Sequence, residues 1–217
     1  MRRLITFTVI FAAICCISCK KEKTPEAPPP PVDTTINVKP TIKTYDVGSF
    51  YEKDGVIGIV YKVDTTGLKG MIVSLDEITN CIWSNTTGST KAGDYDDGKK
   101  NLAAIIEYGD IANFPGFNWC EKKNKDGISG WYLPAIEELW ELGTVYNQLK
   151  DSLKSLKDRG ITGATEFVDG EQYWSSTEVN DQVSGYPNAY YVRLSNPVKN
   201  SSFSKQTALR ARAIRAF

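Results

Sequence analysis

The chain has 217 residues, of which 41% are apolar and 11% are aromatic, enough for the core of one globular domain. It contains no histidine, which removes the commonest general base, the Ser-His and Cys-His nucleophile pairs and most zinc sites. The formal net charge is zero, and once Arg2 and Arg3 leave with a signal peptide, 24 basic residues face 26 acidic ones. This balance argues against nucleic acid as a partner.

Residues 1–18 are expected to be a lipoprotein signal peptide. A basic start is followed by an apolar run over residues 4–17, which suits a signal peptide and is too short to cross a bilayer. The run ends at Cys16-Ile17-Ser18-Cys19, which resembles a bacterial lipobox in which Cys16 replaces the usual leucine. The resemblance implies lipidation of Cys19, which makes the membrane a partner. An ordinary secretory signal is the alternative.

Residues 19–44 are expected to form a linker between the lipidated cysteine and a folded domain over residues 45–217. The run Pro28-Pro29-Pro30-Pro31 favours polyproline II, which extends by ~3.1 Å per residue. Such a linker acts as a spacer that holds a domain away from a membrane.

The first half of the domain combines strands and helices. Apolar residues at 55–63 and 70–75, separated by a glycine-containing turn, predict a β-hairpin. A short apolar run at 81–84 precedes a polar loop. Two helical pieces are predicted, one around residues 101–106 and one over residues 111–121.

The centre of the chain predicts a short strand followed by its longest helix. Trp131-Tyr132-Leu133 suits a strand, and Pro134 is expected to open the helix because its fixed φ suits the first turn. Gly143 is the expected kink, and Arg159-Gly160 the expected end. One apolar stripe follows the helical period: Leu139, Leu142, Tyr146, Leu149, Leu153 and Leu156.

The last part of the domain predicts strands at 173–174, 189–194 and 207–217. Strands at both ends with helices between them indicate an α+β fold. We expect an antiparallel sheet in which the two terminal strands meet, flanked by helices.

Four runs along residues 45–217 form a recognisable series. They are Trp131 to Pro134 with Glu138-Leu139, Tyr173 to Glu178, Tyr191-Val192, and Arg212 to Phe217. The series resembles the family named for the C-terminal domain of a collagen-like bacterial adhesin. The resemblance implies a C-type-lectin-like fold with paired termini and a binding role. Calcium-dependent lectins of this class use motifs that are missing here, so we expect calcium-independent binding and no cofactor.

The lipoprotein start resembles that of surface lipoproteins from Bacteroides-like Gram-negative bacteria. The resemblance implies a location at the outer membrane or cell surface. In that oxidising compartment an even number of cysteines favours a disulfide, and two, Cys81 and Cys120, remain in the domain. Two buried free thiols are the alternative.

Acidic residues form two groups. Asp94, Asp96 and Asp97 offer oxygen ligands to a cation, although their spacing is not that of an EF-hand; a solvated turn beside a helix N-terminus is the favoured alternative. Glu137 and Glu138 are expected to be charges at a helix start rather than paired catalytic acids.

Candidate binding residues lie in the last third of the chain. Arg210 and Arg212 suit acidic ligands, with pairing to internal carboxylates as the alternative. Tyr186, Asn188 and Tyr190 lie in or beside a polar loop, where aromatic rings stack on sugars. Alternation along the strand should bury one of Tyr190 and its neighbour Tyr191.

These features together predict a lipid-anchored envelope module that binds a glycan or a protein, as an adhesin would. One alternative is a structural component of an envelope or fimbrial complex. Another is a hydrolase that uses carboxylates such as Glu178 and Asp169.

Overall fold

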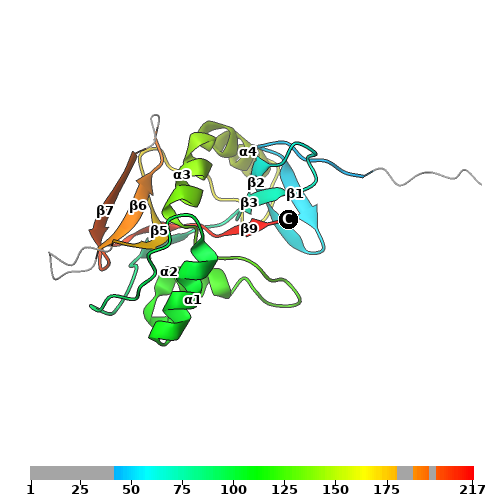
Figure 1. Ribbon diagram of the computed structural model, residues 1–217. Coiled ribbons are helices and arrows are strands. Elements are labelled where there is room, and N and C mark those ends of the chain that lie inside the picture. The colour runs from blue at the N-terminus through cyan, green and yellow to red at the C-terminus, as the bar shows by residue number, and fades with distance from the viewer. Residues whose placement is uncertain (1–41, 180–187, 196–198) are drawn as a thin grey trace, which may run out of the picture. The chain divides into compact units, whose positions relative to one another are not determined.

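Two β-sheets organise residues 42–179, 188–195 and 199–217, the part of the chain that this computed structural model describes (Figure 1). One sheet has the strand order β1-β2-β3-β9, with β1 at Phe50–Lys53, β2 at Val56–Val63, β3 at Gly70–Val73 and β9 at Ile214–Ala216. The other has the order β4-β8-β5-β6-β7, with β4 at Ile78–Cys81, β8 at Leu209–Ala211, β5 at Gln172–Glu178, β6 at Asn188–Arg193 and β7 at Lys199–Ser204. The predicted α+β class is confirmed.

The predicted hairpin is confirmed as β2 and β3, which pair antiparallel. An additional strand, β1, precedes it and turns back through Asp54 and Gly55, both with positive φ, as a tight hairpin turn requires. The register of β2 against β3 shifts between Val60 and Lys62, so Tyr61 is the extra residue of a β-bulge.

The first and last strands belong to one sheet, but the expected pairing of the terminal strands is wrong: β1 and β9 form its opposite edges, and β9 pairs with β3. The single strand predicted over residues 207–217 is wrong as well, since the chain leaves the five-stranded sheet after β8 and enters the other sheet as β9. The strand predicted at Trp131–Leu133 is also wrong: it is a single bridge between Tyr132 and Ile214. Strand β7 was not predicted.

Helices α1 (Gly98–Tyr108) and α2 (Pro115–Glu121) lie near the two predicted helical pieces. The second piece is divided, because a 3₁₀ turn over Ile111–Asn113 ends before Pro115 opens α2.

The longest predicted helix is also divided, into α3 (Ile136–Thr144) and α4 (Tyr146–Asp158). The break lies at Val145, close to the expected kink at Gly143. Ala135 caps α3, so Pro134 precedes the helix instead of opening it. The cap is completed by Glu138, whose Oε2 accepts the Ala135 N–H at 2.9 Å.

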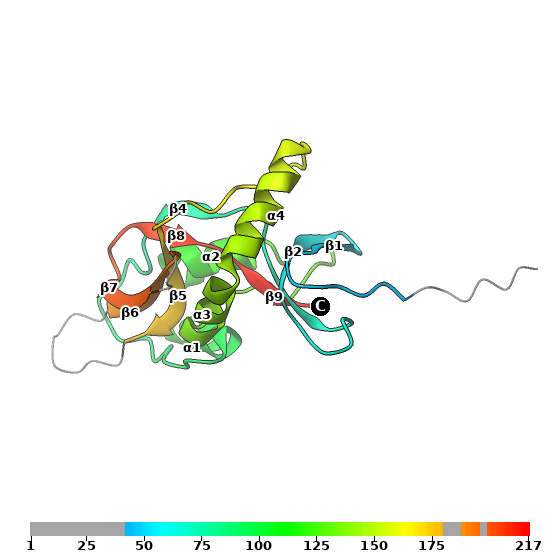
Figure 2. The ribbon, with the colours of Figure 1, turned by 90° about the horizontal axis from the view of Figure 1, so that it is seen from above.

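The predicted apolar stripe is buried along its full length and joins α3 and α4 to residues of β2, β3 and β9 in one core cluster. A second cluster packs α1 and α2 against Trp83, Trp131 and Trp174. In Figure 1, α3 and α4 lie on one side of the sheets and α1 and α2 on the other, and Figure 2 shows α3 and α4 following one another across that side.

Cys81, at the end of β4, and Cys120, in α2, are both buried free thiols, so the predicted disulfide is wrong and its alternative holds. Burial raises the pKa of Cys81 to about 12 and that of Cys120 well above its usual value. Because the thiolate is the form that enters thiol–disulfide exchange, this apolar setting keeps both thiols unreactive.

Both thiols should therefore resist iodoacetamide at pH 8 in the folded protein and react in denaturant without any reductant. Peptide mapping by mass spectrometry measures this at each cysteine. Alkylation of Cys81 and Cys120 only after reduction would show that they form a disulfide.

Candidate functional site

The predicted binding residues of the last third of the chain separate in the structure. Tyr186 lies outside the described residues. Asn188 and Tyr190 are half-buried on β6, while Tyr191 is buried and stacks on Phe203 with ring centroids 4.7 Å apart. The expectation that alternation buries one tyrosine of the pair is confirmed, and Tyr190 keeps part of its surface accessible.

Tyr190 is joined by Tyr95, which no motif in the sequence marks as a binding residue. The Tyr95 hydroxyl donates to the Tyr190 hydroxyl at 2.8 Å, and the ring centroids are 5.4 Å apart. Tyr95 is 45% exposed and comes from the loop before α1, far from β6 in sequence. An aromatic residue between aspartates in a polar loop was the only available signal. We call these two residues the tyrosine pair.

The aspartates around Tyr95 stabilise the turn that leads into α1. Asp94 accepts the N–H groups of Asp96 and Asp97 and pairs with Lys100 at 3.0 Å, which lowers the pKa of Asp94. Asp97 caps α1 by accepting the N–H groups of Lys99 and Lys100. The solvated turn beside a helix start is therefore confirmed. Within the described ranges, no group of three or more His, Cys, Asp or Glu residues is arranged to hold a metal ion.

A cavity of about 500 Å³ is lined by residues that are joined to the backbone of Tyr95, although neither tyrosine of the pair lines it. The cavity and the pair are connected because Asp96, which lines the cavity, follows Tyr95, and because the N–H of Glu137, also in the lining, donates to the Tyr95 carbonyl at 3.0 Å. We call it the acidic cavity. It lies between the β2–β3 hairpin, the loop before α1 and α3, and its lining consists of Tyr61, Lys62, Met71, Asp96, Glu137, Glu138, Trp140, Glu141 and Thr144.

Glu138 forms the inner wall of the acidic cavity. Its carboxylate accepts the Tyr132 hydroxyl at 2.6 Å and the N–H groups of Gly98 and Ala135. Burial outweighs these bonds and raises the pKa of Glu138. Because Glu138 connects the starts of α1 and α3, it holds the two acidic elements of the lining together.

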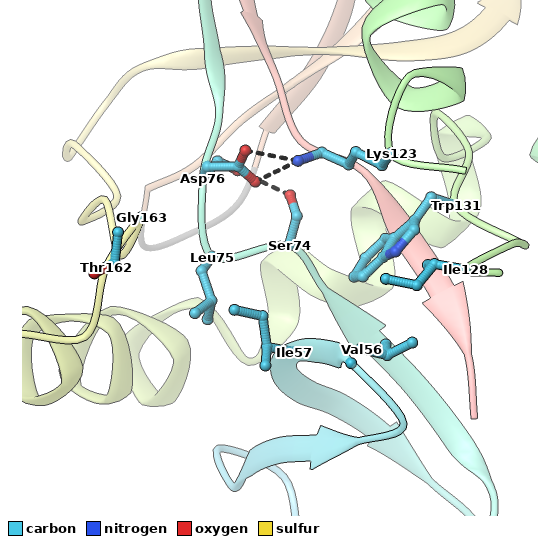
Figure 3. A pocket seen from close by; sticks show the side chains of 11 residues that line it. Val56, Ile57, Ser74, Leu75, Asp76, Lys123, Ile128, Trp131, Thr162 and Gly163 are labelled. Carbon is cyan, nitrogen blue, oxygen red and sulfur yellow. Dashed lines mark hydrogen bonds and ion pairs between the residues drawn. The ribbon is translucent and has the colours of Figure 1, made fainter. Parts of the chain in front are cut away.

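A smaller cavity of about 280 Å³ lies beside β2 and the segment that follows β3 (Figure 3). Val56, Ile57, Leu75, Ile128 and Trp131 contribute apolar walls, and Figure 3 shows Asp76 and Lys123 facing each other at one side. The polar groups here are occupied: Lys123 bonds both Asp76 oxygens and lies over the Trp119 ring, and Ser74 donates to the Asp76 carbonyl. The acidic cavity is therefore the better candidate site.

The predicted anion-binding arginines pair with internal carboxylates instead. Arg212 is 1% exposed and bonds Glu77, the carbonyls of Ser74 and Leu75, and that of Thr165. Arg210 pairs with the same Glu77 and with Glu171. The position of Arg212 does not fit a role in binding an external anion, because the guanidinium is buried and its donors are used.

The carboxylates named for a hydrolase also have structural partners. Glu178 is 3% exposed, pairs with the buried Lys205 at 2.7 Å and accepts the Thr90 N–H and hydroxyl. Asp169 is exposed and pairs with Lys150 and with the Tyr146 hydroxyl. Glu178 is thus neutralised inside the fold, and this pair of residues does not form an open acid–base site.

Neither a scan against models of known protein families nor a search of the curated proteins found a match for this chain. No helix among residues 42–179, 188–195 and 199–217 is long and apolar enough to cross a membrane. Cys19 lies outside the described residues, so its lipidation stays a prediction.

The hydrogen bond to Tyr190 is the largest of the causes that raise the pKa of Tyr95 to about 12. Tyr190→Phe keeps the neighbouring ring and removes the acceptor, so it should move the pKa of Tyr95 back toward its usual value of 10.0. Carbon-13 NMR of labelled tyrosine rings measures this shift. Tyr108→Phe, at an exposed position on α1, is the control and should leave Tyr95 unchanged. An unchanged Tyr95 pKa in Tyr190→Phe would contradict the pairing.

Replacing Arg212 by alanine should lower the free energy of unfolding by about 3–5 kcal/mol, because Glu77 loses one of its two arginine partners and three backbone carbonyls lose their donor. Arg159→Ala, at an exposed position after α4, is the matched control and should stay within about 0.5 kcal/mol. Urea unfolding followed by circular dichroism measures both. Equal effects of the two replacements would show that Arg212 is not structurally important.

Proposed function

We propose that this protein is a binding module of the Gram-negative cell envelope that recognises a glycan without calcium and without catalysing a reaction. A lipid anchor on Cys19 and the linker over residues 19–44 would hold the domain away from the outer membrane, as on the surface of an adhesive cell. The α+β architecture, with the first and last strands in one sheet, supports a C-type-lectin-like fold and the resemblance to the adhesin C-terminal domain family.

The tyrosine pair beside the acidic cavity is the observation that carries this proposal. Aromatic rings stack on the apolar faces of sugars, and carboxylate oxygens accept hydrogen bonds from sugar hydroxyls. The structure brings Tyr95 and Tyr190 together from distant segments, and Asp96, which follows Tyr95, lines a cavity that contains several carboxylates and Trp140. A few placed polar groups with aromatic side chains are typical of small-ligand sites.

Binding is favoured over catalysis by the state of the acidic residues. Glu178 is neutralised by Lys205, and Glu138 accepts three hydrogen bonds that position the fold. The chain also has no histidine to serve as a general base.

Strand β7 supports the second candidate, a role in assembly. It is the last strand in the order of its sheet, and its Phe203 is 37% exposed. Edge strands of this kind pair with strands of other chains. Concentration-dependent association of the purified protein, measured by analytical ultracentrifugation, would favour this alternative.

On a glycan array, the protein should bind at least one carbohydrate class equally well in calcium and in EDTA. Tyr95→Ala and Tyr190→Ala should each weaken that binding by about tenfold, the size of a lost aromatic contact. Tyr108→Ala, at an exposed tyrosine of α1, is the matched control and should bind as the original chain does.

Binding lost in EDTA would contradict the calcium-independent mode and would return attention to Asp94, Asp96 and Asp97. Absence of any glycan binding would reject the proposal and leave the assembly role to be tested by pull-down from the cell envelope.

A further inference from the structure

Tyr61 is a buried residue whose hydroxyl has no hydrogen bond within the described part of the chain. The side chain is 2% exposed and lines the acidic cavity together with Glu138 and Glu141. Tyr61 is also the extra residue of the bulge in β2, a device that redirects side chains next to functional sites. No buried side-chain nitrogen or oxygen of the described residues lacks a hydrogen-bond partner, so the Tyr61 hydroxyl is accessible from the cavity although its ring is buried. It can therefore donate to, or accept from, a ligand in the cavity.

The lining of the acidic cavity has an excess of negative charge. Asp96, Glu137, Glu138 and Glu141 contribute carboxylates, and Lys62 contributes the single ammonium. Lys62 pairs with Glu141 at 2.8 Å. Neither Asp96 nor Glu137 has a side-chain ion pair or hydrogen bond to any described residue. Both are exposed, so their negative charges are open to a ligand, and the excess of carboxylates in the lining favours a cation.

Trp140 provides an aromatic and polar surface in the same cavity. Its ring is half-buried against the α3–α4 core, and its indole N–H makes no hydrogen bond to a described residue. An indole face attracts cations and also stacks on the apolar face of a sugar ring. The N–H is free to donate to a hydroxyl oxygen.

We propose that the acidic cavity binds an amino sugar, whose protonated amino group lies among the carboxylates of Glu137, Glu141 and Asp96. The inference rests on the proposed function and names the class of glycan. Hydroxyl groups of the sugar would form hydrogen bonds with the unpartnered Tyr61 hydroxyl and the Trp140 N–H. The apolar face of the sugar ring would stack on the Trp140 indole.

An amino sugar fits this lining better than a metal ion or a basic peptide side chain. The acidic residues are not arranged as a metal site within the described residues, and a cavity of about 500 Å³ accommodates a sugar ring. A lysine or arginine side chain would satisfy the charge but would offer no hydroxyl to Tyr61 and Trp140.

The test compares two tetrasaccharides with the same sugar backbone: β-1,4-linked glucosamine, which carries protonated amino groups, and its fully N-acetylated form, in which each amino group is an uncharged acetamide. Isothermal titration calorimetry on the full chain at pH 6, in detergent, should give a glucosamine affinity at least about tenfold higher, as for a hydrogen bond to a charged group. Glu137→Gln, Glu141→Gln and Tyr61→Phe should each reduce that affinity by about fivefold or more. Glu107→Gln, at an exposed position on α1, is the matched control and should leave it unchanged.

Equal affinity for the two tetrasaccharides would overturn the amino-group assignment and leave the proposed glycan binding in place. Tetralysine binding as tightly, with the same sensitivity to Glu137→Gln, would overturn the sugar assignment. Glucosamine binding that is unaffected by Glu137→Gln and Glu141→Gln would place the ligand elsewhere. Circular dichroism checks that each variant is folded. The proposed function is tested separately, by the binding of Tyr95→Ala and Tyr190→Ala on the glycan array.

Discussion

The buried ion pair between Arg212 and Glu77 is the interaction on which the two-sheet arrangement depends. The chain passes between the sheets twice at this place, once from β3 to β4 and once from β8 to β9. Arg212 bonds the carbonyls of Ser74 and Leu75 on the first passage, and the Ser74 N–H donates to the Ala213 carbonyl on the second. Both charged side chains are buried, and Glu77 is the ion-pair partner that compensates the Arg212 charge, so the pair holds both passages in one arrangement.

Glu138 has a comparable role at the candidate site. It connects the first residue of α1, the cap of α3 and the hydroxyl of Tyr132, whose backbone pairs with Ile214 of β9. The acidic loop before α1 and the acidic first turn of α3 are thereby held on one side of the β2–β3 hairpin. The bulge at Tyr61 completes this arrangement by placing a polar hydroxyl where the hairpin faces α3.

Regular patterns in the sequence were sufficient for much of the fold. The stripe of leucines and tyrosines predicted α3 and α4 because burial on one helix face follows the helical period. The hairpin of β2 and β3 was predicted from two apolar runs on either side of a glycine-containing turn. The sheet that contains both the first and the last strand was also expected, but the two strands form its opposite edges instead of pairing. The divided C-terminal strand was missed because the local pattern on either side of Arg212 continues without interruption. Only the partner strands show that β8 and β9 belong to different sheets.

The candidate site was predicted only in part. Tyr190 was selected for its place in an aromatic strand beside a polar loop. An aspartate of the group Asp94, Asp96 and Asp97 was expected near a helix start, and Asp97 is the one that caps α1. Tyr95, Tyr61 and Trp140 carry no local signal of binding, because their significance depends on residues that are distant in sequence. Arg210 and Arg212 had the residue type of an anion site, but the position of Glu77 decided that they pair internally.

The sequence by itself determined the α+β class, the amphipathic helices, the absence of histidine chemistry and the prediction of a lipidated N-terminus. These depend on composition and on spacings of a few residues, which local physical chemistry governs. The tertiary structure alone decided that the two cysteines are free, that the arginines are internal, and that an unpartnered tyrosine faces a group of carboxylates. Each of these outcomes depends on which distant side chains share a buried space, and this is decided by the packing of the whole domain.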